Sequence, residues 1–251
     1  MIRPVDLLRQ GRKEELWQMC CGFVDLSLEQ FMAIQKRLLL EQIELLENSE
    51  LGRKVMHGAM PTTVEEFREQ VPLTTYADYC PELPEKKEEA LPAKPAMWVR
   101  TSGYAGKYDI KWVPMSEDFC REYEKLGGGS ALLAFCNGSS DISRVKEHMK
   151  ALATMGTLEY GSGAGCSLAQ QAVGYDLLPH SAKEMSFEER IKAGFEEALY
   201  RGLDGFAGLP SILVAVGERF KQQSGKINIR PLLPHPKALV YRIRNSDGSR
   251  L

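Results

Sequence analysis

Two aliphatic hydroxyls, two glycines and two lysines lie within eleven residues, between positions 101 and 111. Glycine allows the backbone to approach a ligand closely, and successive backbone N–H groups in such a turn form a concave anion site. Lys107 and Lys111 would add positive charge. The pattern predicts a phosphate-binding loop, although a plain glycine-containing hairpin turn explains the local sequence at least as well.

The segment departs from a Walker A loop, which needs a glycine five residues before its Gly-Lys pair and Ser or Thr after it. Thr101 and Tyr108 occupy those two positions. Short β-like runs, Met97–Arg100 and Ile110–Val113, flank the segment. We therefore expect it to connect two neighbouring antiparallel strands.

Two further motifs accompany this segment. Residues 71–79 read Val-Pro-Leu-Thr-Thr-Tyr-Ala-Asp-Tyr, and residues 111–114 read Lys-Trp-Val-Pro. In this order and spacing, the motifs resemble the adenylate-forming, acyl-CoA synthetase-like superfamily. The resemblance is closest to phenylacetate-CoA ligase-like enzymes and to the plant acyl-acid amido synthetases that conjugate auxin. It runs from about residue 31 to about residue 236 and covers only the N-terminal part of such enzymes.

The resemblance implies an ATP-dependent ligase. Such enzymes join a small carboxylic acid to ATP as an acyl-adenylate, release pyrophosphate, and pass the acyl group to a thiol or an amine, such as coenzyme A or an amino acid. The phosphates of ATP are negatively charged, and Mg²⁺ would neutralise that charge together with the backbone donors, hydroxyls and lysine of the loop. Carried over by position, the loop residues would be Thr101, Ser102, Gly103 and Gly106, with Lys111 as the following lysine. No catalytic residue is assigned.

The chain also departs from the family pattern. Tyr104 and Ala105 stand where hydroxyl residues are usual, and alanine cannot donate a hydrogen bond from its side chain. Residues 160–163 begin like the adenine motif, but Ala164 replaces its glutamate. No C-terminal catalytic lysine motif is found. We expect either the N-terminal portion of a ligase, inactive as a fragment and truncated before these elements, or a non-catalytic binding or regulatory module that keeps the fold.

Composition narrows the functional class. The formal net charge of −2 and the sequence pI of about 6.2 argue against a dedicated nucleic-acid binder. The six cysteines form no Cys-x-x-Cys pair and no metal-ligand spacing with the four histidines, so no metal site is predicted. No apolar run approaches the length of a membrane span, and no signal-peptide pattern opens the chain. A cytoplasmic protein without a membrane partner is expected.

The elements that would position the loop divide into two parts. Residues 1–95 read as a helical leader of a large domain, and residues 96–251 as the α/β part of the same domain. Helices are predicted from Val5 to Cys21, from a Ser27 capping box, from Glu50 to Met56, and from Thr63 to Gln70. The apolar face of the second helix is expected to pack in a core; its residues are Leu28, Phe31, Ile34, Leu38, Ile43 and Leu46.

After Met97, strands and helices are expected to alternate, so the fold class is α/β with a helical leader packed on a mixed sheet. Ser116 would cap a helix to about Leu126, followed by a glycine break and a buried strand, 131–136. Asp141 would cap a helix to about Thr154, before a short strand near 157–160. Residues 161–165 read as a plain loop, or as a wall of an acyl or nucleotide pocket. Helices from Ser186 to Arg201 and from Pro210 to about Phe220 complete the prediction.

Overall fold

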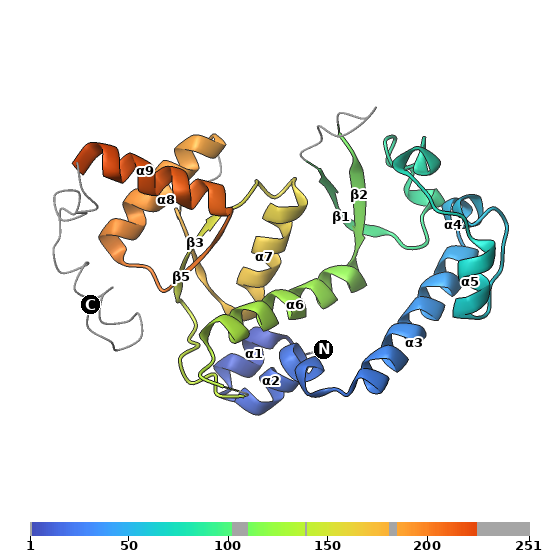
Figure 1. Ribbon diagram of the computed structural model, residues 1–251, viewed down its shortest axis with the longest axis horizontal. Coiled ribbons are helices and arrows are strands. Elements are labelled where there is room, and N and C mark those ends of the chain that lie inside the picture. Colours follow the sequence, from blue (N-terminus) through green and yellow to red (C-terminus); the bar gives the residue numbers. More distant parts are fainter. Residues whose placement is uncertain (1, 102–109, 139, 181–184, 225–251) are drawn as a thin grey trace.

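A computed structural model of the protein describes residues 2–101, 110–138, 140–180 and 185–224. Helices dominate, and two small sheets lie among them (Figure 1). The α-helices are α1 (Pro4–Arg9), α2 (Lys13–Cys21), α3 (Leu28–Glu47), α4 (Glu50–Val55), α5 (Val64–Gln70), α6 (Glu117–Phe135), α7 (Gly161–Val173), α8 (Phe187–Arg201) and α9 (Pro210–Ser224). Three 3₁₀ turns are η1 (Gly22–Asp25), η2 (Tyr76–Tyr79) and η3 (Glu88–Ala90).

The two sheets differ in strand direction. Strands β1 (Pro95–Arg100) and β2 (Trp112–Ser116) form an antiparallel pair. This confirms the prediction that residues 101–111 connect two neighbouring antiparallel strands. Strands β3 (Lys150–Thr154), β4 (Asp176–Leu178) and β5 (Gly205–Gly208) form a parallel sheet in the order β4-β3-β5. Helices α7 and α8 connect these parallel strands in sequence, as such crossovers require. The mixed α/β class is therefore confirmed.

Helix α6 lies at the centre of the molecule. The glycine break predicted within it is wrong. The helix runs unbroken through residues 127–129 into the stretch predicted to be a strand. A Cβ added to Gly127 would lie 2.7 Å from the Cα of Ala169 in α7, and one added to Gly129 would lie 2.5 Å from the backbone oxygen of Cys20 in α2. The glycines thus admit two neighbouring helices, and this packing outweighs their low helix propensity.

The segment after α6 also differs from the prediction. The expected helix from Asp141 to Thr154 is wrong, because residues 140–149 form turns and residues 150–154 form β3. The Asp141 carboxylate accepts a hydrogen bond from the Ser143 backbone N–H at 3.1 Å, which closes a local turn instead of a helix. The expected strand near 157–160 is reduced to a single parallel bridge between Tyr160 and Arg100.

The N-terminal leader is less uniform than predicted. The single helix expected over Val5–Cys21 is wrong: the helix is divided into α1 and α2 around Gly11, whose φ of +69° is left-handed. Helices α1 and α2 pack against α6, whereas α4 and α5 lie at the far end of α3 (Figure 1). The domain boundary at residues 95 and 96 stays a prediction.

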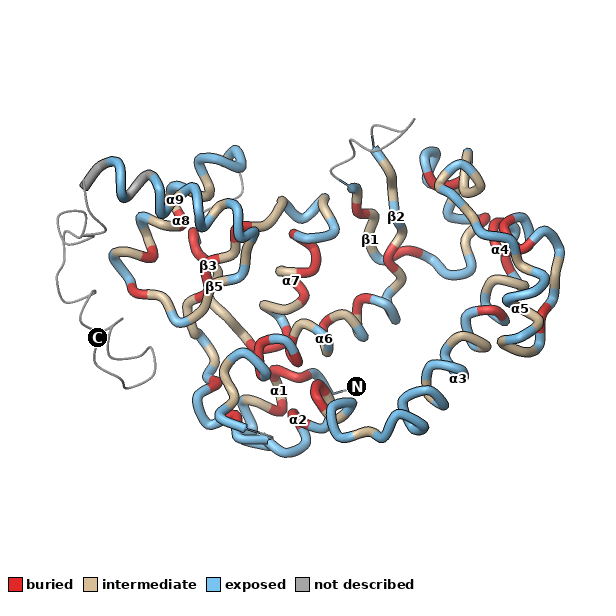
Figure 2. Tube along the Cα trace, viewed as in Figure 1, coloured by how far each residue is buried: buried red, intermediate tan, exposed pale blue. Residues whose placement is uncertain are grey.

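Helix α3 is long and largely exposed between these two ends (Figure 2). Its C-terminal half packs through Ile43, which is 2% exposed, against α4 and the turns after α5. Its N-terminal half keeps Leu28 at 71% and Phe31 at 40% exposure. The prediction of a continuous core-facing stripe is therefore wrong for that half, because the described residues place no neighbouring element over it.

Side-chain caps confirm the predicted starts of three helices, α3, α6 and α8. Ser27 and Gln30 form the reciprocal capping box at α3, and Ser186 and Glu189 form another at α8. The Ser116 hydroxyl accepts the Phe119 N–H at the start of α6. Each cap satisfies a backbone donor that the first helical turn leaves free. Within the described residues, no helix is both long and apolar enough to cross a membrane.

Candidate functional site

The two ends of the predicted phosphate loop meet across the hairpin. The backbone N–H of Thr101 donates to the carbonyl of Lys111 at 3.0 Å, directly beyond the last strand pair, Arg100 and Trp112. Thr101 is exposed and Lys111 is half-buried. The other three predicted loop residues, Ser102, Gly103 and Gly106, lie outside the described residues. The structure thus brings together the first and last members of the predicted site.

Tyr76, from the motif at residues 71–79, contacts the exit of this loop. Its hydroxyl accepts the Trp112 backbone N–H at 2.9 Å and donates to the Trp112 carbonyl at 3.4 Å. The Lys111 Nζ lies 5.8 Å from the centre of the Tyr76 ring, within the range of a cation–π interaction. Burial raises the pKa of the Tyr76 phenol, so the hydroxyl stays protonated and available as a donor.

A second lysine, Lys86, comes from the turn before η3 and packs against the same strand pair. The Nζ of Lys86 sits 3.4 Å from the Trp112 ring centre and 5.8 Å from that of Trp98. The Trp98 indole N–H donates to Glu88 at 3.4 Å. Lys86 was not among the predicted site residues, because residues 1–95 were predicted to be a helical leader and no local motif marks this lysine.

The last residue of β1 links the hairpin to the start of α7. The Arg100 backbone N–H donates to the Glu159 carbonyl at 2.7 Å, its guanidinium pairs with the Glu159 carboxylate at 2.5 Å, and it covers the Tyr160 ring at 4.5 Å. Among the described residues, the buried Nε of Arg100 has no hydrogen-bond partner. The loop end of the hairpin and the N-terminus of α7 therefore lie side by side (Figure 1).

Residues 161–165, predicted to be a loop, form the first turns of α7. A Cβ on Gly163 would lie 2.0 Å from the Thr157 carbonyl oxygen, so the segment before the helix folds directly onto it. The Arg190 guanidinium of α8 donates to the Met155 and Gly156 carbonyls at 2.5 and 3.4 Å. Glycine here permits close backbone packing, which the sequence pattern alone does not distinguish from a turn.

The parallel sheet ends beside this segment. Thr154 and Gly208 are the last register pair of β3 and β5. Thr154 is fully buried, its hydroxyl has no hydrogen-bond partner among the described residues, and a Cβ on Gly208 would lie 1.9 Å from that hydroxyl. Strand β3 is central, with β4 on one side and β5 on the other. In open α/β sheets, ligands bind at the carboxyl ends of the strands where the strand order reverses in this way.

Four of the six cysteine thiols are poorly suited to act as nucleophiles. Burial raises the pKa of Cys20 to about 12 and that of Cys21 to about 11. Burial also raises the pKa of Cys120 and of Cys166 in α7. A thiol with a raised pKa is protonated at neutral pH and is a poor nucleophile. A covalent acyl intermediate on any of these four thiols is therefore disfavoured.

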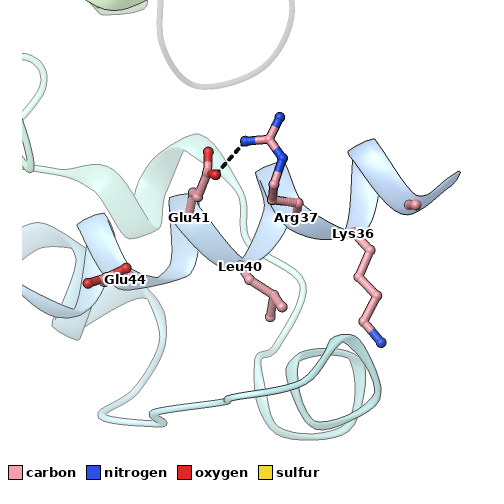
Figure 3. A pocket seen from close by; sticks show the side chains of 6 residues that line it. Lys36, Arg37, Leu40, Glu41 and Glu44 are labelled. Carbon is pink, nitrogen blue, oxygen red and sulfur yellow. Dashed lines mark hydrogen bonds and ion pairs between the residues drawn. The ribbon is translucent and has the colours of Figure 1, made fainter. Parts of the chain in front are cut away.

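A shallow hollow on α3 is separate from the hairpin. Its lining comes from one helix: Ala33, Lys36, Arg37, Leu40, Glu41 and Glu44 (Figure 3). Arg37 and Glu41 pair with each other at 2.5 Å, so these two charges are matched. The hollow lies on a single helix and includes no residue of the predicted phosphate loop.

The fit to the groups expected from the sequence is partial. Lys111 and Thr101 provide a cation and a hydroxyl at the hairpin end, which suits a phosphate. Across the described residues, no three His, Cys, Asp or Glu side chains gather as a metal site would require. The described residues therefore give no ligand set for Mg²⁺.

An antiparallel hairpin beside a small parallel sheet covered by helices is consistent with part of the N-terminal domain of an adenylate-forming enzyme. A family model described as the GH3 family N-terminal domain matches residues 21–176. The match spans more than half of the chain, so the chain belongs to the GH3 family of adenylate-forming acyl-acid amido synthetases. A comparison with curated proteins gives no match.

Proposed function

We propose that the chain provides the N-terminal part of an ATP-dependent acyl-acid ligase, in which the hairpin between β1 and β2 binds the phosphates of ATP. The observation that carries the proposal is the pairing of Thr101 with Lys111 at the base of a Thr-Ser-Gly segment in a GH3 family member. Lys111 would place its ammonium beside the phosphates. Thr101 is exposed at the loop entrance, where its hydroxyl would be available to the same phosphates.

The carboxylic acid substrate would bind at the carboxyl edge of β3 and β5, next to the start of α7. Three features support this location: the buried Thr154 hydroxyl, the absence of a side chain at Gly208, and the Arg100 guanidinium at the adjoining end of β1. An acid held there would lie between the sheet edge and the hairpin. Its carboxylate would then face the phosphate that it attacks, as proximity requires.

The acyl acceptor is proposed to be an amine. Members of the family conjugate acids to amino acids with ATP, and the raised pKa values of Cys20, Cys21, Cys120 and Cys166 argue against a relay through those four thiols. Coenzyme A as acceptor, the other outcome of the sequence resemblance, would give a thioester product in place of an amide. Product analysis by mass spectrometry with both acceptors present decides between them.

The experiment on the phosphate site is titration calorimetry of the full chain with pyrophosphate and Mg²⁺. We compare the wild type with Lys111→Ala and with Lys94→Ala, which removes an exposed lysine before the other end of β1. A charge-assisted hydrogen bond contributes about 1.5–3 kcal/mol, so Lys111→Ala should weaken binding roughly ten- to a hundredfold. Lys94→Ala should bind like the wild type.

Two results would contradict the proposal. Wild-type protein that binds neither pyrophosphate nor ATP would remove the phosphate site and favour a non-catalytic role for the fold. Equal losses in the two lysine variants would show that binding follows net charge and not the hairpin. A loss confined to Lys111→Ala supports the site.

A further inference from the structure

The motif at residues 71–79 lies outside the hairpin, yet one of its side chains contacts the hairpin backbone. We infer that Tyr76 is a positioning residue, which fixes the peptide unit that carries Lys111 and so holds that lysine at the phosphate site. The inference rests on the proposed function, because it assigns a role within the same site.

The peptide unit between Lys111 and Trp112 is held on both sides. Its carbonyl oxygen, from Lys111, accepts the Thr101 N–H at 3.0 Å across the hairpin. Its N–H, from Trp112, points the opposite way and donates to the Tyr76 hydroxyl at 2.9 Å. In a two-stranded hairpin this outward N–H belongs to an open sheet edge. Tyr76 occupies that edge where a third strand would otherwise bond.

The same phenol restricts the Lys111 side chain. The ammonium lies 5.8 Å from the Tyr76 ring centre, so the ring attracts the charge while the hydroxyl holds the backbone. Lysine has a long flexible stem and loses up to about 2 kcal/mol of rotamer entropy when it is ordered. A neighbour that orders the lysine before the ligand arrives reduces this cost at the moment of binding.

The motif also supplies its own control. Tyr79 lies three residues later in η2, and its hydroxyl bonds to the Thr74 hydroxyl at 2.8 Å. Among the described residues, it therefore makes its hydrogen bond within the motif and none to the hairpin. Tyr76→Phe and Tyr79→Phe each remove one phenolic oxygen from the same turn, but only the first releases the Lys111–Trp112 peptide unit.

The test measures pyrophosphate affinity in the full chain, with Mg²⁺, for Tyr76→Phe, Tyr79→Phe, Lys111→Ala and the double variant Tyr76→Phe/Lys111→Ala. Loss of one hydrogen bond of ordinary strength predicts a roughly five- to tenfold weaker dissociation constant for Tyr76→Phe. Tyr79→Phe should stay within about twofold of the wild type. Because Tyr76 acts through Lys111, the double variant should bind no more weakly than Lys111→Ala alone.

Thermal unfolding and amide exchange separate positioning from general destabilisation. The two phenylalanine variants should show similar unfolding midpoints, while the Trp112 amide exchanges faster only in Tyr76→Phe. Wild-type affinity in Tyr76→Phe, or effects of Tyr76→Phe and Lys111→Ala that multiply in the double variant, would overturn the inference while leaving the phosphate site intact. Wild-type protein that binds no pyrophosphate would overturn the proposed function and this inference with it.

Discussion

Glu82 is a carboxylate that the fold buries, with 7% of its surface exposed. Lys54 of α4 pairs with it at 2.7 Å and also donates to the Cys80 carbonyl at 2.6 Å. Burial acts to raise the pKa of Glu82, but the Lys54 hydrogen bond, the Glu82 backbone N–H and nearby lysine charge outweigh it, so the pKa is lowered. The pair thus connects α4 to the turn that follows Tyr79.

Lys54→Met should destabilise the protein by about 1–3 kcal/mol, because it leaves a buried carboxylate without its cation. Unfolding in urea at pH 7 measures the change, and Lys54→Met/Glu82→Gln should recover most of it. Since the folded-state pKa of Glu82 is depressed, its stabilisation is present above the unfolded value of about 4.5 and is lost as the pH falls. The penalty of Lys54→Met should therefore shrink below that pH; an unchanged penalty at pH 3.5 would contradict this account.

The thiol of Cys20 makes the opposite pH prediction. Its pKa is raised by burial to about 12 from an ordinary value of 9.0, so the folded state retains a proton that the unfolded state loses. This stabilisation is complete below pH 9, the ordinary pKa, and declines as the pH rises from 9 toward the folded-state pKa of about 12. We expect Cys20→Ala to lose less stability than the wild type between pH 8 and pH 10, compared by urea unfolding. Equal losses would show that Cys20 does not titrate on unfolding.

The candidate site was predictable from sequence only where partners are close along the chain. The pairing of Thr101 with Lys111 follows from a hairpin, and hairpins have local signals. Tyr76 reaches Trp112 across 36 residues, and Arg100 reaches Glu159 across 59. Such contacts depend on how the elements fold together, and single-sequence patterns carry no record of that. The motif containing Tyr76 was recognised, but its physical role was not.

At the scale of elements, helix starts with a Ser or Thr cap were predicted well, but the Asp141 start and the effect of glycine were predicted poorly. Caps are local, because a hydroxyl and a backbone N–H three residues later decide them. The glycines of α6 and α7 were interpreted as breaks, although in the structure they face Ala169, Cys20 and Thr157 across close contacts. Glycine lowers helix propensity wherever it stands, and only the packing partners show whether a helix keeps it.

Replacing each of two helical glycines by alanine should have opposite effects on stability. Gly129→Ala in α6 should lower stability by about 1–3 kcal/mol, because the new methyl would lie 2.5 Å from the Cys20 carbonyl oxygen. Gly217→Ala in α9 should raise helix stability by about 0.5–1 kcal/mol, since no described heavy atom lies within 4 Å of the added Cβ. Thermal unfolding followed by circular dichroism compares both variants with the wild type. A stabilising Gly129→Ala would show that α2 moves away at little cost.

For the whole molecule, the α/β class was predictable because the change from helical to strand-like patterning near residue 97 is strong in the sequence. The burial of α3 was not. Apolar spacing along this helix gives one face, yet the described residues cover only its C-terminal half. Amphipathic patterning indicates which side of a helix is apolar, but it contains no information on whether another element covers that side.

Buried apolar residues gather in separate clusters, and strand β1 lies between two of them. Trp98 packs on the cluster of α3 and α4, formed by Ile43, Leu51, Val55, Met56, Leu83 and Ala90. Val99, the next residue, belongs to a different cluster with α6 and α7. Successive residues of a strand face opposite sides. Strand β1 therefore separates the two clusters and contacts one with each of its faces.

Such a division limits the cooperativity of unfolding. The α3–α4 cluster should open at lower denaturant than the α6–α7 cluster, so that no single transition describes the chain. In Trp17→Phe/Trp112→Phe, Trp98 is the only tryptophan left of the three, and its fluorescence reports on the first cluster. We expect its midpoint in urea to precede that of far-ultraviolet circular dichroism. Coincident midpoints would mean that β1 couples the two cores into one cooperative unit.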